Sequence, residues 1–211
     1  MTVQLETTMS TALEHYQLLN HPFYRRWEAG ELSRDELTHY AEQYRFFETM
    51  LPTFLETLSE KLPEGPIRNS VMANLEDEVS PPSHLELFEE FAYSYDASNP
   101  EISPATRHLV DSYSQLLERG SASSLAGLWA YESQGAAIAD SKAVSLIQHY
   151  NAGSEAVAFW SVHGSVEGDH ARWTLEALEA LNPDVEEVET AATLIGGAWW
   201  SFLDERESFA A

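Results

Sequence analysis

Residues 37–58 read LTHYAEQYRFFETMLPTFLETL, and the apolar side chains in this stretch recur every three or four residues. They are Leu37, Tyr40, Tyr44, Phe47, Leu51, Phe54 and Leu58. This spacing places them on one face of an α-helix, because a helix completes a turn every 3.6 residues. Similar spacing continues through nearly the whole chain, and strand-like alternation is not sustained in any segment. The pattern predicts an all-α protein.

Short breaks in the helical pattern divide the chain into segments. They lie at residues 20–22, 30–33, 62–66, 80–83, 97–104, 120–124, 151–154 and 182–184. Ser33 and Ser83 are each followed three residues later by Glu, which is the capping-box pattern of a helix start. We therefore expect about seven or eight helices joined by short loops, in a single domain spanning residues 1–211.

The charge of the chain limits the partners that it can bind. Its 211 residues include 35 acidic and 11 basic side chains, a formal net charge of −24. Such a surface repels phosphate backbones and anionic lipid, so we expect neither a nucleic-acid nor a membrane partner. A cation is a more natural ligand. The only lysines are Lys61 and Lys142, and their scarcity beside so many carboxylates suggests a protein adapted to concentrated salt, a halophilic character.

Two absences in the sequence restrict its chemistry and location. The chain has no cysteine, so a metal site must use His, Asp and Glu, and a cysteine nucleophile is excluded. The first ten residues lack the pattern of a secretory signal, and no apolar run reaches the length of a membrane span. We expect a cytoplasmic protein.

The stretch FWSVHGSVEGDH, residues 159–170, contains a candidate metal-binding stripe. On a helix, His163, Glu167 and His170 project within about 60° of one another, since each residue turns the helix by about 100°. Two imidazoles and a carboxylate suit Fe(II), Mn(II) or Zn(II). The alternative is a pair of surface histidines on a solvated acidic helix.

Two further segments offer candidate ligands. Glu78 closes one predicted helix and His84 opens the next, so the two can converge on one ion across a Pro-Pro turn. The alternative is an acidic helix end followed by an ordinary first-turn histidine. Glu132 is the one charged residue in segment 128–139, where a buried carboxylate needs a metal or an ion-pair partner such as Arg45.

Together these segments provide three carboxylates and three imidazoles from several helices, the composition expected around two metal ions. The candidate ligands are Glu78, His84, Glu132, His163, Glu167 and His170.

The same segments resemble motifs of the haem-oxygenase-like di-iron oxidases, a superfamily that shares its fold with TenA thiaminases and the pyrroloquinoline quinone synthase PqqC. Asn-Leu-x-Asp-Glu followed by His occupies residues 74–84, Tyr-Glu-Ser-Gln occupies 131–134, and His-x3-acid-x2-His occupies 163–170. Within the superfamily the chain is most similar to the CADD-type proteins, which make p-aminobenzoate for folate. The similarity runs from about Leu18 to Ala171.

This resemblance implies a haem-oxygenase-like (TenA/PqqC-like) all-α bundle that holds two metal ions, Fe/Fe or Fe/Mn, at the six candidate ligands. It also implies an oxidoreductase that uses O2 as co-substrate and takes electrons from an external donor. Related folds often dimerise, so we expect a homodimer.

Two more residues match the CADD-type pattern. Tyr24, in His-Pro-Phe-Tyr-Arg-Arg-Trp at 21–27, matches the tyrosine implicated as the sacrificed precursor of the p-aminobenzoate ring. Lys142, ten residues after Glu132, matches the lysine implicated as amino donor. The resemblance thus implies a self-sacrificing p-aminobenzoate synthase. Without it, Tyr24 reads as a core residue, and Lys142 as a side chain that reaches solvent or pairs near Asp140.

The chain also departs from the CADD-type pattern. The segment between Glu78 and His84 is one residue shorter, which makes Asp77 a competing ligand, and Glu167 stands where the family has Asp. The alternative functions are a related di-iron oxidase that acts on an external fatty acid or amino acid, and a metal-free TenA-like module that binds a partner protein or a thiamine-like molecule. The absence of cysteine counts against the common thiaminase branch.

Overall fold

Helices make up all of the regular structure that the computed structural model describes, residues 2–209. The four longest are α3 (Arg34–Lys61), α7 (Ser121–His149), α8 (Ser154–Ala180) and α9 (Val185–Ser208). The shorter ones are α1 (Thr2–Ala12), α2 (Pro22–Ala29), α4 (Pro66–Val79), α5 (His84–Ser94) and α6 (Pro104–Arg119), with 3-10 turns at Glu14–Tyr16 and Leu18–Asn20. The all-α prediction is confirmed. The nine α-helices of the described residues compare with the seven or eight expected.

Local signals explain where several helices begin and end. The predicted capping boxes are present at the starts of α3 and α5, where Ser33 and Ser83 each exchange hydrogen bonds with the Glu three residues later. Gly30 ends α2 with a φ of 73°, a left-handed conformation that glycine adopts without steric strain. The helix lengths are therefore largely set by local sequence.

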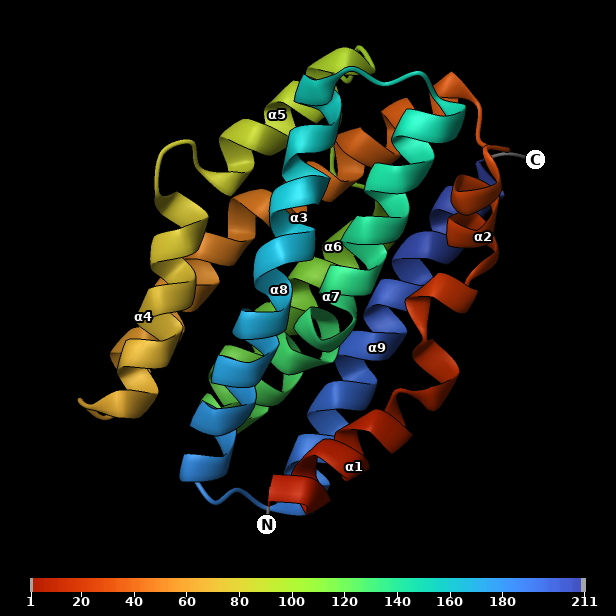
Figure 1. Cartoon of the computed structure of the whole chain (residues 1–211). Helices are drawn as coiled ribbons and strands as arrows, with labels where there is room; N and C mark the ends of the chain where they lie inside the picture. Colours follow the sequence, from red (N-terminus) through yellow and green to blue (C-terminus); the bar gives the residue numbers. More distant parts are fainter. Residues whose placement is uncertain (1, 210–211) are drawn as a thin grey trace.

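Helix α7 lies at the centre of the bundle, packed against α8, α9 and α6 (Figure 1). The α4–α5 hairpin covers α3 and α8 on one side, while α1 and α2 lie along α9 on the other. The middle of α7 is consequently surrounded by protein, and residues 123–132 are all buried. No helix within residues 2–209 is long and apolar enough to cross a membrane.

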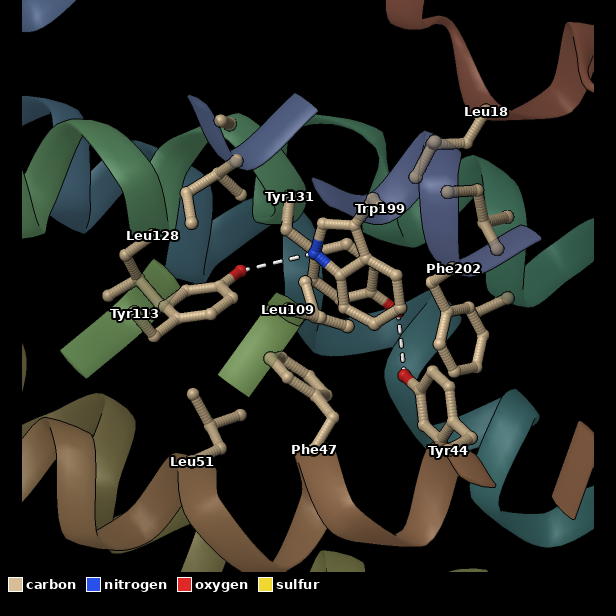
Figure 2. Close-up of a cluster of buried hydrophobic side chains, with 14 of the residues drawn as sticks. Leu18, Tyr44, Phe47, Leu51, Leu109, Tyr113, Leu128, Tyr131, Trp199 and Phe202 are labelled. Atoms are coloured by element: carbon tan, nitrogen blue, oxygen red, sulfur yellow. Dashed lines mark hydrogen bonds between the residues drawn. The ribbon is translucent and has the colours of Figure 1, made fainter. Parts of the chain in front are cut away.

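Aromatic side chains fill the interior between α3, α6, α7 and α9 (Figure 2). The indole of Trp199 stacks on Tyr131 with ring centroids 4.3 Å apart, and its Nε1 donates to the hydroxyl of Tyr113 over 3.2 Å. The hydroxyls of Tyr44 and Tyr131 lie 2.6 Å apart. These polar tips are paired with one another, so the rings are buried without leaving the hydroxyls unsatisfied.

His21 anchors α2 to α9. Its Nδ1 accepts a hydrogen bond from the backbone N–H of Phe23 over 3.1 Å, which caps α2, and its Nε2 lies 3.1 Å from a carboxylate oxygen of Asp204. Burial lowers the pKa of His21, which favours the neutral ring with the proton on Nε2. This contact sets the position of α2 and keeps Tyr24 inside the bundle.

Close packing of α6 and α9 on α7 depends on Gly127. A Cβ atom added at Gly127 would lie 2.1 Å from Cδ1 of Leu116 and 3.0 Å from Cγ1 of Ile195. Both neighbours are fully buried, so they have little room to move away. Gly168, on the exposed face of α8, has no such neighbour within 4 Å.

We predict opposite effects of alanine at these two glycines. Gly127→Ala should lower the free energy of unfolding by about 1–3 kcal/mol, because the added methyl overpacks the core. Gly168→Ala should raise it by about 0.5–1 kcal/mol, because alanine favours the helix and meets no neighbour. Urea unfolding of both variants measures the difference. A Gly127→Ala protein as stable as the wild type would contradict the packing described.

Candidate metal centre

The six sequence-predicted ligands are buried, and they gather into two triads between α4, α5, α7 and α8. The first triad is Glu78, His84 and His163, and the second is Glu132, Glu167 and His170. Within each triad the candidate ligand atoms lie within 4.8 Å of one another. Oε1 of Glu167 is also 3.8 Å from Nε2 of His163, so the two triads are adjacent.

The first triad joins the end of α4, the start of α5 and the middle of α8. Nδ1 of His84 lies 2.9 Å from Oε2 of Glu78, yet it is not aligned with any hydrogen-bond partner among the described residues. Nδ1 of His163 is 3.0 Å from the carbonyl oxygen of Phe159, which can only accept, so Nδ1 carries the proton. This leaves the Nε2 lone pair of His163 free, the arrangement usual for metal-bound histidine.

Glu132 of the second triad is held by two neutral donors. Its Oε1 accepts from Nδ2 of Asn74 over 2.6 Å, and its Oε2 accepts from Oγ1 of Thr174 over 2.7 Å. Arg45, considered above as a partner, instead pairs with Glu89. Burial raises the pKa of Glu132. Among residues 2–209, both hydrogen-bond donors to Glu132 are thus uncharged side chains.

Glu167 of the second triad depends on a glycine in the facing helix. A Cβ at Gly135 would lie 2.9 Å from the carboxyl carbon of Glu167, so a larger residue there would displace the carboxylate from its position between α7 and α8. Oε2 of Glu167 has no hydrogen-bond partner among residues 2–209. Burial, together with the charges of Glu132 and Glu78, raises the pKa of Glu167 well above its usual range.

The structure separates Asp77 from Glu78, which the sequence left as competing ligands. Glu78 is buried in the first triad, whereas the side chain of Asp77 is 43% exposed and belongs to neither triad. An oxygen of Asp77 lies 3.1 Å from Nε2 of His170. Asp77 can therefore orient the ring of His170 from the edge of the site.

The donor set fits a pair of divalent cations. Oxygen and imidazole nitrogen donors are those that Fe(II) and Mn(II) accept. Burial, with the charge of His84, lowers the pKa of His163 well below its usual range and keeps that ring unprotonated, the form that binds metal. Nδ1 of His84 and Oε2 of Glu167 are buried without an aligned hydrogen-bond partner in the described part of the chain, which is destabilising unless a ligand satisfies them. The two triads together can hold two metal ions.

Tyr24 and Lys142 meet in the buried interior, where each is 2% exposed. Together with Tyr40, Trp27 and Trp160 they form a closely packed cluster, the Tyr24–Lys142 pocket. Nζ of Lys142 donates to the hydroxyl of Tyr24 over 3.0 Å and to that of Tyr40 over 2.6 Å. It also lies 4.0 Å from the ring centroid of Trp160. Lys142 thus points inward, neither to solvent nor to Asp140. Burial lowers the pKa of Lys142 well below its usual range and raises that of Tyr24.

The antiparallel arrangement of α7 and α8 places this pocket beside the first triad. Gly135 meets Glu167 and Asp140 meets Gly164, so later residues of α7 face earlier residues of α8. Lys142, about 15 Å along α7 from Glu132, is therefore on the side of His163. The charge of Lys142 contributes to the lowered pKa of His163. The Tyr24–Lys142 pocket and the two triads form one continuous buried region.

Two residues of this region were missed by the sequence analysis. The hydroxyl of Tyr40, like that of Tyr24, accepts a hydrogen bond from Nζ of Lys142. Glu48 of α3 is buried, and neither of its carboxylate oxygens has a hydrogen-bond partner among the described residues. One signal could have found Glu48. At helical spacing it falls between Tyr44 and Leu51, which makes it a charged residue within the apolar stripe of residues 37–58.

Two relatives align with this chain over most of its length. It is 31% identical over 216 residues to a 4-aminobenzoate synthase of Nitrosomonas europaea, covering 93% of this chain and 88% of the relative. It is 29% identical over 202 residues to a 4-aminobenzoate synthase of Chlamydia pneumoniae, covering 90% and 89%.

Solved structures share the fold. A TenA homologue from Pseudomonas syringae superposes with a TM-score of 0.80 at 15% identity, covering 97% of this chain and 91% of that one. A domain with a haem-oxygenase-like fold from Shewanella denitrificans gives 0.78 at 14% identity, covering 99% and 92%. The predicted haem-oxygenase-like, TenA-like bundle is confirmed.

The sequence pattern of one family, described as iron-containing redox enzymes, matches residues 38–204. That range includes all six residues of the two triads and Lys142, while Tyr24 lies before it. Because the match spans most of the chain and a relative is 31% identical over most of both lengths, the chain belongs to the family of iron-containing redox enzymes.

Proposed function

We propose that this protein is an O2-dependent oxidase with two metal ions, Fe/Fe or Fe/Mn, that forms 4-aminobenzoate from its own Tyr24 and Lys142. The observation that carries the proposal is the 3.0 Å hydrogen bond between Nζ of Lys142 and the phenolic oxygen of Tyr24 in the buried interior of the bundle. The relatives named 4-aminobenzoate synthase, at 29% and 31% identity, support it.

The product maps onto these two side chains atom by atom. In 4-aminobenzoate an amine stands para to a carboxyl group, and in tyrosine a hydroxyl stands para to Cβ. Cβ of Tyr24 would become the carboxyl carbon, so the Cα–Cβ bond breaks, and Cα takes up a hydrogen and stays in the backbone as a glycyl residue. Nζ of Lys142 would replace the phenolic oxygen, so a ring C–N bond forms, the Cε–Nζ bond breaks and Cε is left as an aldehyde. The atoms balance with two O2 molecules as oxidant and two electrons and two protons from an external donor, and two molecules of water leave.

The pocket prepares the amine and the phenol for this exchange. The lowered pKa of Lys142 favours the neutral amine, which is the nucleophilic form. The hydroxyl of Tyr40, 3.0 Å from that of Tyr24, holds the phenol against the amine. The surrounding rings of Trp27 and Trp160 keep water away. When bound, the two metal ions would supply the chemistry that activates O2.

We predict that the wild-type chain retains two metal ions after production with iron and manganese supplied. His163→Ala should lower the metal content to one ion or fewer per chain, because a ligand with a free Nε2 is lost. His108→Ala, at an exposed position on α6, is the matched control and should retain two. Elemental analysis of the purified proteins measures this. A wild-type chain without bound metal would refute the proposal that this protein is a metal-dependent oxidase.

We also predict that Tyr24→Phe abolishes 4-aminobenzoate formation, because the phenolic oxygen is the atom exchanged. Tyr40→Phe should retain formation at a lower rate, because it removes only a hydrogen-bond partner. Product analysis and intact-mass measurement after aerobic iron loading compare the two. If Tyr24→Phe releases 4-aminobenzoate, or if the wild-type chain releases it with both side chains intact, the substrate is an external molecule.

The two-lysine composition allows a direct test of the amino donor. Protein labelled with nitrogen-15 lysine carries the label only at Lys61 and Lys142. We expect labelled 4-aminobenzoate from the wild type and from Lys61→Arg, since Lys61 is exposed and bonds the carbonyl oxygen of Leu117. Lys142→Arg should give none. Mass spectrometry of the product reads out the label, and unlabelled product from the wild type would exclude Lys142 as donor.

A further inference from the structure

We infer that Glu48 of α3 is a fourth carboxylate ligand of the two-metal centre, an inference that rests on the proposed function. Glu48 belongs to a helix that contributes no member of either triad. It is nevertheless buried in the same region, with 2% of its surface exposed.

The first observation is that the carboxylate of Glu48 is buried without a partner. Neither Oε1 nor Oε2 has a hydrogen bond among residues 2–209. The hydroxyl of Tyr44, one turn earlier on α3, acts to lower the pKa of Glu48. In the structure, however, that hydroxyl is paired with the hydroxyl of Tyr131, 2.6 Å away. A carboxylate in this state is strongly destabilising unless it is protonated or meets a cation.

The second observation is where this carboxylate lies. The ring of Tyr44, one turn before Glu48, lies 6.3 Å from the ring of Phe159, which in turn lies 4.0 Å from the ring of His163. The ring of Phe47, the residue before Glu48, lies 5.3 Å from that of Tyr131, the residue before Glu132. Tyr40, two turns before Glu48 on α3, accepts a hydrogen bond from Nζ of Lys142 over 2.6 Å. Burial and the charge of Glu78 raise the pKa of Glu48 well above its usual range. The buried face of α3 that carries Glu48 therefore packs against side chains next to a member of each triad and next to Lys142.

The third observation is the charge balance of the buried region. Glu78, Glu132 and Glu167 supply three negative charges, whereas two divalent ions bring four positive charges. A fourth buried carboxylate makes the set neutral, which favours holding both ions away from water. Asp77 does not fill this role, because its side chain is 43% exposed and open to hydration. Ferritin-like di-iron proteins likewise place four carboxylates around two ions.

The sequence also explains how α3 presents Glu48 to the site. The side chains of Tyr44, Glu48 and Leu51 recur every three or four residues, so they share the buried face of α3. The ion pair between Arg45 and Glu89 ties α3 to α5, the helix that carries His84. The position of Glu48 is thus linked to that of one member of the first triad.

The test compares Glu48→Gln with Glu36→Gln in the full-length chain. Glu36 lies on the same helix and is similarly buried, but it pairs with Arg26 and caps α3, away from the triads. Both proteins and the wild type are titrated with Fe(II) without oxygen, against a competing chelator. We expect Glu48→Gln to weaken the binding of at least one ion by tenfold or more, the scale at which supporting carboxylates act. Glu36→Gln should bind both ions like the wild type.

A second readout separates a ligand from a structural residue. Without metal, Glu48→Gln should melt at or above the temperature of the wild type, because it removes an uncompensated buried carboxyl group. Its rise in melting temperature on adding Fe(II) should be smaller than that of the wild type. Glu48→Asp keeps the charge on a shorter side chain, so it should weaken Fe(II) binding less than Glu48→Gln does. It replaces Glu48→Gln in the titration if that variant does not fold.

Each outcome decides one of the two claims. Two ions bound by Glu48→Gln with wild-type affinity would overturn the role of Glu48 and leave the proposed function intact. A lower melting temperature without metal, combined with an unchanged rise on adding Fe(II), would also overturn it in favour of a packing role. A wild-type chain that binds no Fe(II) would overturn the proposed function, and this inference with it.

Discussion

Burial of acidic side chains in the middle of a helical bundle is the constraint that shapes the rest of this molecule. Glu48, Glu78, Glu132 and Glu167 lie inside, where solvent does not screen their charges. Of these, Glu132 is satisfied by two neutral donors, while oxygens of Glu48 and Glu167 have no partner among the described residues. The folding free energy that keeps them there comes from the aromatic core between α3, α6, α7 and α9. Bound cations would offset the cost of burying these carboxylates and so stabilise the folded state.

The packing of α7 against α8 connects the metal centre to the Tyr24–Lys142 pocket. Gly135 makes room for Glu167 at one level of this contact, and Gly164 makes room for Asp140 at another. Lys142 consequently lies near the first triad, in surroundings dry enough to lower its pKa. The two triads and the amine of Lys142 thus share one closed interior, although their residues are spread along the chain.

Sequence periodicity was sufficient for the fold, because helix length, capping and the apolar stripes are local properties. The three motifs also brought together residues that the structure places in two triads. Other features of the site depend on how the helices pack, and sequence patterns alone do not reveal them. The choice between Asp77 and Glu78 follows from how α4 ends against α5, which residue spacing does not determine. Glu48 belongs to no motif, and it stands out only through the burial of a carboxylate that lacks hydrogen-bond partners among the described residues. Tyr40 similarly reads as one more core aromatic until Lys142 is found beside it.

Anomalous X-ray diffraction at the iron edge, from crystals of the Fe(II)-loaded protein grown without oxygen, tests the central claim most directly. The account predicts two iron peaks between α4, α5, α7 and α8. One should be bound by Glu78, His84 and His163, and the other by Glu132, Glu167 and His170. A single peak, or no peak among these side chains, would contradict a two-metal centre in this bundle.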